Sequence, residues 1–160
     1  MEVALFEPRI PQNTGNIARS CAAFNIPLNL IEPLGFKLED KYLKRAGLDY
    51  WPLVNFNKYE NFDKFLDSKL TKRIISFSKK NGRYLNDFKF QEDDILLFGR
   101  EDSGLPESII DKSDVLISIF MPNLQIENNE KKGVRSLNLS VACGIAIYEA
   151  HKQINFQNGN

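Results

Sequence analysis

Residues 95–106 read Ile95-Leu96-Leu97-Phe98-Gly99-Arg100-Glu101-Asp102-Ser103-Gly104-Leu105-Pro106. The apolar run 95–98 is too short for a helix and is bounded by acidic residues and a glycine, which is typical of a strand buried on both faces. The glycines that follow permit backbone conformations closed to other residues and let a flat ligand approach the main chain. The alternative is an ordinary glycine-containing turn between a strand and a helix. The stretch therefore predicts a buried strand with a candidate ligand loop at its end.

The rest of the chain alternates between short apolar runs and segments with helical spacing. Strands are predicted at residues 3–6, 28–31, 73–78, 95–98 and 115–120, and helices at residues 16–24, 42–46, 61–70, 106–110 and 137–152. This alternation, without internal repeats, predicts an α/β fold whose open, mostly parallel sheet carries helices on both faces. Ligands of such sheets bind outside the carboxyl ends of the strands, so the loops there are the candidate sites.

The composition is that of one globular domain. The chain has 160 residues, of which 42% are hydrophobic and 26% charged, and this length suits a single domain. We assign residues 1–155 to that domain and expect residues 156–160 to form a disordered tail. The 21 basic and 21 acidic residues cancel, so global charge gives no sign of a nucleic-acid partner, and any RNA site must be local.

The cysteines and the hydropathy pattern indicate a reduced, cytoplasmic protein. Cys21 and Cys143 lie far apart in apolar surroundings, which favours buried thiols over a disulfide or a metal pair. No segment approaches the ~18 consecutive apolar residues of a membrane helix, and the N-terminus lacks a basic signal region. His151 is expected to be a solvated residue near a helix end, because a metal site needs several convergent ligands. No metal and no membrane contact are predicted.

A second candidate ligand loop covers residues 7–19. Asn13-Thr14-Gly15-Asn16 follows a proline and predicts a turn that offers side-chain caps to a helix beginning near Asn16. Arg19 follows one turn later. Free N–H groups, the helix dipole and a guanidinium all favour an anion such as phosphate. The simpler alternative is that Asn and Thr cap the helix and that Arg19 is solvated.

A third candidate loop, Arg135-Ser136-Leu137-Asn138-Leu139-Ser140, opens the last predicted helix. Ser136 or Asn138 could cap this helix, but capping does not explain Arg135. The first half of the helix is apolar on nearly all sides, so it must be covered on more than one side. We therefore expect the helix to lie at a subunit interface as well as against the sheet.

Together the three loops resemble a known class of enzymes. The segments NTGNIAR (13–19), FGREDSGLP (98–106) and RSLNLSVACGIAIYEA (135–150) match, in order and spacing, the motifs of SPOUT-class methyltransferases of the SpoU-like branch. The segments IEPLGF (31–36) and RAGLDY (45–50) are similar to those of the minimal members that methylate the tRNA wobble nucleotide. The resemblance covers nearly the whole chain.

This resemblance implies a fold, a reaction and a set of partners. The fold would contain a deep trefoil knot formed by the C-terminal segment, and two subunits would pack as a homodimer to complete each site. The reaction would transfer a methyl group from S-adenosylmethionine to the ribose 2′-hydroxyl of nucleotide 34 of tRNA, a cytidine or a modified uridine. The expected partners are tRNA and a second copy of the chain, without DNA.

The resemblance also assigns site residues. The implied catalytic residues are Arg19, Asn16, Ser136, Asn138 and Glu101. The implied cofactor-binding residues are Phe77, Gly99, Glu101, Gly104, Ile119, Ser136 and Leu137. The implied RNA-binding residues are Arg19, Lys44, Arg45, Arg135 and Tyr148. Because a guanidinium stays protonated in proteins, Arg19 is expected to stabilise the developing alkoxide and hold a phosphate rather than to act as a base.

Three local basic groups interrupt the neutral chain and are either RNA contacts or solvated faces. They are Lys37, Lys41, Lys44 and Arg45; Lys79, Lys80 and Arg83; and Lys131, Lys132 and Arg135. Two features depart from the family pattern. A polar insert at 127–133 lengthens the loop after the last predicted strand, and Arg100 stands where relatives often carry proline.

Three alternatives stay open from the sequence. A ribosomal-RNA ribose methyltransferase of the same branch is disfavoured, because such relatives commonly carry an additional N-terminal RNA-binding domain and this chain begins at its first strand. A non-catalytic RNA-binding dimer is disfavoured by the presence of Arg19, Glu101, Ser136 and Asn138. Another kind of nucleotide-binding α/β protein would need a glycine-rich phosphate loop, which is missing.

Overall fold

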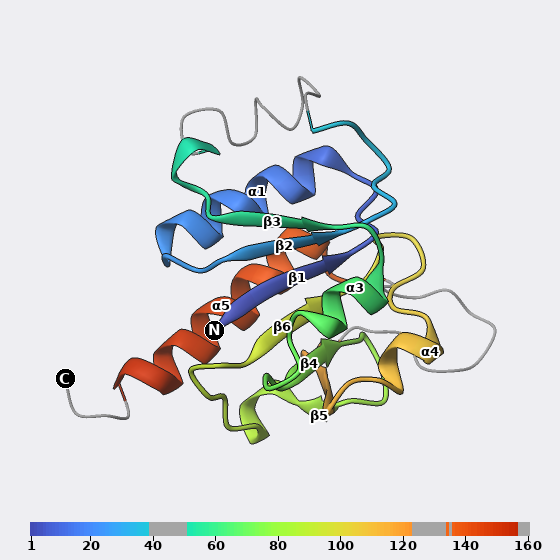
Figure 1. The fold of residues 1–160 in the computed structure, drawn as a ribbon. Helices are drawn as coiled ribbons and strands as arrows, with labels where there is room; N and C mark the ends of the chain where they lie inside the picture. Colours follow the sequence, from blue (N-terminus) through green and yellow to red (C-terminus); the bar gives the residue numbers. More distant parts are fainter. Residues whose placement is uncertain (39–50, 123–133, 135, 157–160) are drawn as a thin grey trace.

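The strands of this computed structural model form one parallel sheet. The model describes residues 1–38, 51–122, 134 and 136–156. Within these residues the sheet has seven strands in the order β3-β2-β1-β6-β4-β7-β5 (Figure 1), and all neighbouring strands are parallel. The strands are β1 Glu2–Phe6, β2 Leu28–Ile31, β3 Phe56–Tyr59, β4 Ile74–Phe77, β5 Arg83–Tyr84, β6 Ile95–Phe98 and β7 Val115–Ser118. The predicted α/β sheet is confirmed.

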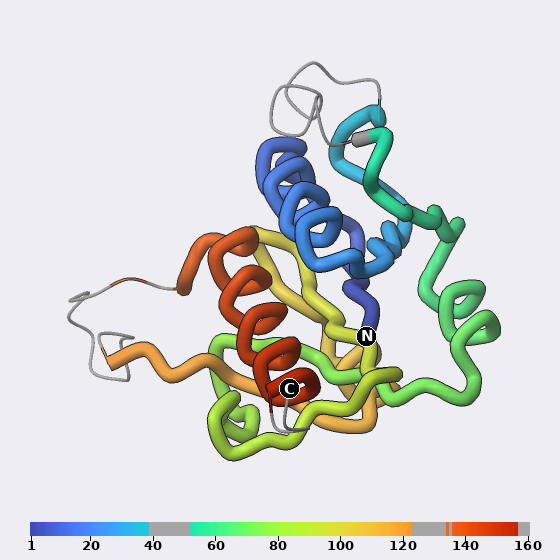
Figure 2. The backbone as a smooth tube through the Cα atoms, turned by 90° about the vertical axis from the view of Figure 1, so that its left-hand side faces the viewer, coloured from blue at the N-terminus to red at the C-terminus, as the bar shows by residue number. Residues whose placement is uncertain are grey.

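Helices cover both faces of this sheet, as predicted. The α-helices are α1 Pro11–Ala23, α3 Phe62–Asp67, α4 Glu107–Ile110 and α5 Leu139–Phe156, and the 3₁₀ helices are η1 Trp51–Leu53 and η2 Leu85–Asp87. Successive strand residues point to opposite faces. Val3 and Leu5 accordingly pack in the cluster that contains α1 and α5, whereas Ala4 and Phe6 pack in the cluster that contains α3 and α4. Figure 2 shows α1 and α5 side by side.

Apart from Glu2 at the start of β1, the two central strands are apolar because they are buried on both faces. All five residues of β1 and all four of β6 are buried, and the two strands pair directly, with Val3 opposite Leu96. The strand order reverses between β1 and β6. From β1 the chain continues to β2 and β3 on one side of the sheet, whereas β6 pairs with β1 on its other side. A crevice outside the carboxyl ends of the strands is the usual ligand position in such a sheet.

The start of α1 differs from the prediction. The helix begins at Pro11 rather than near Asn16, and its N-cap residue, Ile10, makes no side-chain capping hydrogen bond. Proline suits the first helical position, because its ring presets a helical φ and no N–H partner is needed there. The segment predicted as a capping turn is therefore the first part of the helix, with Asn13 and Thr14 buried.

Other elements extend or add to the prediction. Helix α5 runs to Phe156, beyond the expected end at residue 152, and the edge strands β3 and β5 were not predicted. The first residue of the tail predicted at 156–160, Phe156, is instead the last residue of α5. The predicted helix at 42–46, the insert at 127–133 and residues 157–160 of that tail lie outside the described residues.

Two predictions about the apolar parts of the chain can be compared with the structure. Both cysteines are free and buried, as expected, and burial raises the pKa of Cys21 to about 12. In the part of the chain that the structure describes, none of the helices has the length and hydropathy of a membrane span.

Candidate functional site

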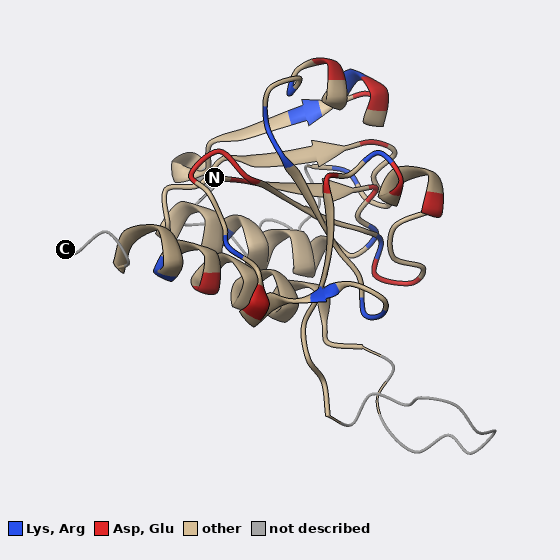
Figure 3. Cartoon of the chain, turned by 90° about the horizontal axis from the view of Figure 1, so that it is seen from below, with Lys and Arg blue, Asp and Glu red and all other residues tan. Residues whose placement is uncertain are grey.

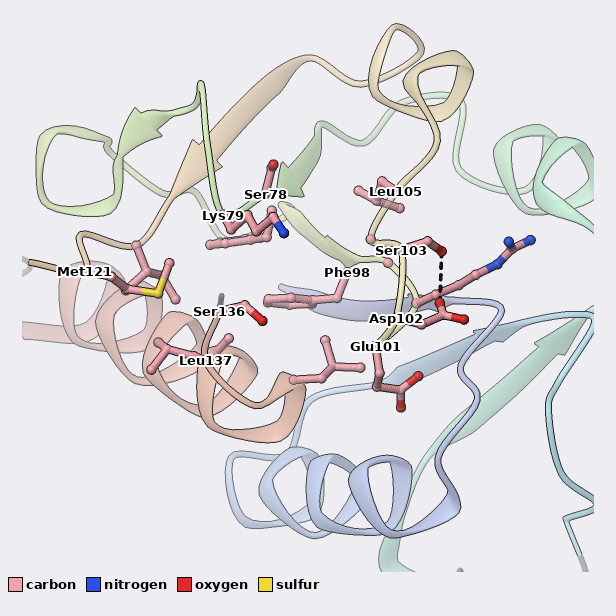
Figure 4. Close-up of a pocket in the computed structure, with 17 residues that line it drawn as sticks. Ser78, Lys79, Phe98, Glu101, Asp102, Ser103, Leu105, Met121, Ser136 and Leu137 are labelled. Carbon is pink, nitrogen blue, oxygen red and sulfur yellow. Dashed lines mark hydrogen bonds between the residues drawn. The ribbon is translucent and has the colours of Figure 1, made fainter. Parts of the chain in front are cut away.

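A cavity of about 420 Å³ opens at the carboxyl ends of β4, β6 and β7 (Figure 4). Its walls come from the ends of these strands, from the loop after β6 and from the start of α5, and comprise Phe77, Ser78, Lys79, Phe98, Gly99, Arg100, Glu101, Asp102, Ser103, Gly104, Leu105, Ile119, Met121, Ser136, Leu137, Leu139 and Ala142. Pockets of ~300–1,000 Å³ are typical of small-molecule sites. The cavity lies where the sheet topology predicts a ligand.

All seven residues that the sequence assigned to cofactor binding line this one cavity. They are Phe77, Gly99, Glu101, Gly104, Ile119, Ser136 and Leu137. They come from four segments that are far apart in the sequence and meet only because parallel strands end at the same edge of the sheet. Their binding role stays a prediction, but their convergence is a property of the fold.

The loop after β6 closes back on itself and requires both of its glycines. Arg100 and Gly104 exchange two backbone hydrogen bonds, of 3.1 and 2.9 Å. A Cβ atom on Gly99 would lie 2.2 Å from the carbonyl carbon of Gly104, and Gly104 itself has a φ of +73°. A side chain at Gly99 would force the returning backbone away, and one at Gly104 would be strained.

Two aromatic rings form an apolar wall of the cavity. The rings of Phe77 and Phe98 are stacked, with centroids 4.5 Å apart and an interplanar angle of 13°. Both side chains stand at strand ends and line the cavity. The rigid, flat surface that they form is suited to an apolar ring of a ligand.

Glu101 joins the loop after β6 to the loop before α1. Its carboxylate accepts hydrogen bonds from the backbone N–H groups of Arg9, at 2.8 Å, and Ile10, at 3.1 Å, and from Asn13 Nδ2, at 3.2 Å. In Figure 4 the carboxylate is directed toward the start of α1. The protein's own carboxylate therefore binds the two backbone N–H groups that directly precede the observed start of α1.

A second side-chain bridge extends this network to α5. Asn138 Nδ2 donates to Asn13 Oδ1 at 3.0 Å, and Asn138 Oδ1 accepts from the N–H of Ser140 at 2.8 Å. Asn138 thus caps α5, as the simpler interpretation held, and it also connects α5 to α1. The chain Glu101–Asn13–Asn138 links all three sequence motifs. Asn13 was not assigned a role from the sequence, although its position at the start of the NTGNIAR motif was the available signal.

Two arginines share one carboxylate at the carboxyl end of β1. Arg9 Nη2 lies 3.3 Å from Glu7 Oε2, and Arg100 Nη2 contacts the same oxygen. The guanidinium carbon of Arg100 also lies 5.7 Å from the centroid of the Phe6 ring. Arg100 therefore holds the loop after β6 against β1, which gives a structural account of its departure from the family pattern.

The remaining predicted residues lie apart from the cavity or outside the described residues. Asn16 and Arg19 are exposed on α1 and are not among the residues that line the cavity. Tyr148 is exposed on α5. Lys44, Arg45 and Arg135 lie outside the described residues. One chain thus brings the predicted cofactor residues together, but it does not bring Arg19 to them.

The charged residues that line the cavity belong to the loops after β4 and β6. The pKa of Asp102 is lowered mainly by a hydrogen bond from the Ser103 hydroxyl and, to a smaller extent, by hydrogen bonds from backbone N–H groups. Across residues 1–38, 51–122, 134 and 136–156, no group of three or more His, Cys, Asp or Glu side chains is placed to hold a metal ion.

The fold and the cavity together define an α/β protein with a small-molecule site at the carboxyl edge of a parallel sheet, closed by a glycine loop and the start of a C-terminal helix. The model of the SpoU rRNA Methylase family matches residues 1–148. The chain therefore belongs to the SpoU rRNA methylase family, as the motifs indicated.

Individual relatives match the chain over nearly its whole length. The tRNA (cytidine(34)-2′-O)-methyltransferase of Methylovorus glucosotrophus is 39% identical over 155 residues, covering 97% of this chain and 96% of the relative. That of Saccharophagus degradans is 40% identical over 157 residues, with 96% of each chain covered. A solved structure described as "Structural insights into the 2-OH methylation of C/U34 on tRNA" has a TM-score of 0.87 and 43% identity, covering 99% of this chain and 97% of the other.

Proposed function

We propose that this protein transfers a methyl group from S-adenosylmethionine to the ribose 2′-hydroxyl of nucleotide 34 of tRNA. The observation that carries the proposal is the meeting of the three motifs: two line one cavity, and the third is joined to them through Asn13. Full-length relatives named for cytidine 34 methylation support the choice of tRNA. They favour it over the ribosomal RNA in the name of the family.

The cavity suits a nucleoside-containing cofactor. Its volume, its flat wall of Phe77 and Phe98 and its glycine-closed loop fit a ligand with a planar base. Phe77, Gly99 and Ile119 would hold the adenine end, and the residues around Ser136 would hold the remainder. When bound, S-adenosylmethionine supplies an electrophilic methyl group on a sulfonium.

The chain's own residues would position the ribose and stabilise its oxygen. The guanidinium of Arg19 would stabilise the developing 2′-alkoxide and clamp an adjacent phosphate, which would accept the proton. Ser136 and Asn138 would orient the ribose. Positioning of this kind supplies a large part of the rate gain in reactions with two substrates.

We further propose that the working form is a homodimer. Helix α5 exposes Val141, Ile145 and Tyr148, which are 50%, 38% and 61% exposed and lie along one face of the helix by their spacing. An apolar stripe on a long helix is a typical subunit contact. Because Arg19 does not line the cavity of its own chain, the α1 helix of a second copy would be needed to complete the site.

The proposal also includes the other features that the family resemblance implies. They are the deep C-terminal trefoil knot, RNA contacts by Lys44, Arg45 and Arg135, and a cytoplasmic location.

Methylation of bulk tRNA with methyl-labelled cofactor, followed by nuclease digestion and nucleoside mapping, tests the function. The expected product is a 2′-O-methylated nucleotide at position 34 of a subset of tRNAs. Label at another position, or label only in ribosomal RNA, would contradict the assignment.

The matched variant is Arg19→Lys, which keeps the charge and loses the planar fork. It is expected to bind tRNA and to lose most turnover. Near-normal turnover with unchanged tRNA binding would contradict the role given to the guanidinium.

A further inference from the structure

Two aromatic side chains at the β5 edge of the sheet are exposed and contact each other. Tyr84 and Phe120 are 53% and 64% exposed. Their ring centroids are 5.8 Å apart, and the rings meet edge to face at 87°. A single exposed aromatic residue is ordinary, but two in contact form an apolar patch that water solvates poorly. Neither ring belongs to the hydrophobic core of the described residues.

The backbone fixes the position of both rings. Strand β5 pairs with β7, with Tyr84 opposite Ser118, and the N–H of Gly82 donates to Ser118 Oγ at 3.0 Å. Phe120 lies two residues beyond the end of β7. Because Tyr84 stands on paired backbone and its ring contacts that of Phe120, little conformational entropy is lost when a ligand packs on the pair.

The pair does not line the cavity, but Phe120 is adjacent in the chain to residues that do. Phe120 lies between Ile119 and Met121, and both of these neighbours line the cavity. Lys79, on the segment that leads into β5, lines it as well (Figure 4). A ligand that extends out of the cavity past Ile119 and Met121 would therefore reach the segment that carries Phe120.

The segment around the pair carries only positive charge. Residues 78–84 contain Lys79, Lys80 and Arg83 and no acidic residue, and all three cations are exposed. Figure 3 marks basic positions in blue, including those on β5 and on the loop ahead of it. Exposed aromatic rings beside basic side chains are the combination that binds single-stranded nucleic acid, by base stacking and phosphate contact.

We propose that Tyr84 and Phe120 form a stacking surface for an unpaired base of the RNA substrate, with Lys79 and Lys80 contacting its phosphates. This inference rests on the proposed function. A symmetric contact with a second copy fits the patch less well, because it would bring the same three cations against each other.

The test is binding of a fluorescently labelled anticodon stem-loop RNA, measured by anisotropy in the presence of S-adenosylhomocysteine. Tyr84→Ala and Phe120→Ala are each expected to raise the Kd about tenfold, the usual effect of losing one stacked base. Tyr84→Phe should bind like the unchanged protein, whereas Tyr84→Leu should bind like Tyr84→Ala, since stacking needs a ring face and not a hydroxyl. Leu70→Ala, at a side chain 84% exposed, is the control and should have no effect.

Several results would overturn the inference. These are an unchanged Kd in both alanine variants, absence of stem-loop binding by the unchanged protein, and recovery of binding in Tyr84→Leu. A shift of Tyr84→Ala to monomer in sedimentation would assign the pair to a contact between copies. Weaker binding of S-adenosylhomocysteine by Tyr84→Ala, in calorimetry, would assign it to the cofactor site. The proposed function is judged separately, on tRNA methylation by the unchanged protein.

Discussion

Carboxylates are held at both ends of the sheet, but by different partners. At the amino end, Glu2 is 6% exposed and accepts hydrogen bonds from Lys69 and Lys72, each with an N–O distance of 2.6 Å. At the carboxyl end, Glu101 accepts its hydrogen bonds from two backbone N–H groups and an amide. The first carboxylate is neutralised by cations and stabilises the fold. The second orders the loops around the cavity.

The pKa of Glu2 shows how strongly this carboxylate interacts with Lys69 and Lys72. Burial by itself would raise this pKa, but hydrogen bonds from Lys69, Lys72 and Asn29 outweigh burial and bring it to about 2. A carboxylate whose pKa is lowered by folding stabilises the folded state at neutral pH. We therefore expect Glu2 to be important for stability and Glu101 for activity, and each carboxylate can be removed alone.

The largest effect is expected from Glu101→Ala. The change leaves the N–H groups of Arg9 and Ile10 and the amide of Asn13 without their acceptor, so the loop before α1 should move relative to the cavity. Misplacement of about 1 Å costs roughly 100-fold in rate, and methyl transfer to tRNA should fall at least that much. Glu101→Gln is the matched control and should keep part of the activity, because one oxygen remains. Full activity of the alanine variant in a turnover assay would show that Glu101 is no more important for activity than Glu2.

The next effect is expected from Glu2→Gln, and it concerns stability alone. The folded pKa of Glu2, about 2, lies below its ordinary value of 4.5, so its contribution is complete above pH 4.5 and is lost as the pH falls toward 2. At pH 7 the variant should lose roughly 3 kcal/mol of unfolding free energy, and the loss should shrink in acid. Denaturant unfolding at pH 7 and pH 3 measures both values. A loss independent of pH, or a loss of turnover at 25 °C, would contradict the assignment.

The sequence predicted the interior of the sheet better than its edges. Strands β1, β2, β4 and β6 are buried over their whole length and mostly apolar, and β7 is apolar up to its last residue. Apolar runs of this kind are visible in a sequence. Strand β3, Phe56–Tyr59, alternates less clearly because it pairs only with β2 and is partly exposed. Strand β5 has two residues, too few for any periodicity. Edge strands of this kind are specified by the sheet that they join.

The cavity was predictable from its motifs, but the network behind it was not. The residues lining it stand directly after apolar strands, where sequence spacing carries information. The hydrogen bonds from Asn13 to Glu101 and Asn138 join residues 88 and 125 positions apart, and no local pattern encodes such pairs. The start of α1 was misplaced for a related reason. Asn13-Thr14-Gly15-Asn16 has the composition of a turn, but its burial beneath the loops keeps it helical.

A smaller effect is expected from the bridge between Asn13 and Asn138. Both single changes to alanine remove the shared 3.0 Å hydrogen bond, and each also removes a bond of its own, from Asn13 to Glu101 or from Ser140 to Asn138. The double-mutant cycle isolates the shared bond and should give a coupling energy of about 1 kcal/mol in unfolding free energy. The two changes should also be non-additive in turnover, because both act through the position of α5 relative to α1. Additive effects on stability and rate would show that Asn13 and Asn138 do not act together in the network of Glu101, Asn13 and Asn138, the carboxyl-end network.

The smallest effect is expected from Thr14→Val, a change within the same motif. The Thr14 hydroxyl is fully buried and has no hydrogen-bond partner among the described residues. Burying a hydroxyl without a partner costs free energy, and valine keeps the shape of the side chain. Thermal unfolding should show an unchanged or slightly higher Tm, with turnover retained. A clear loss of stability would reveal a polar partner for Thr14, supplied by a ligand or a second copy, and would extend the carboxyl-end network into α1.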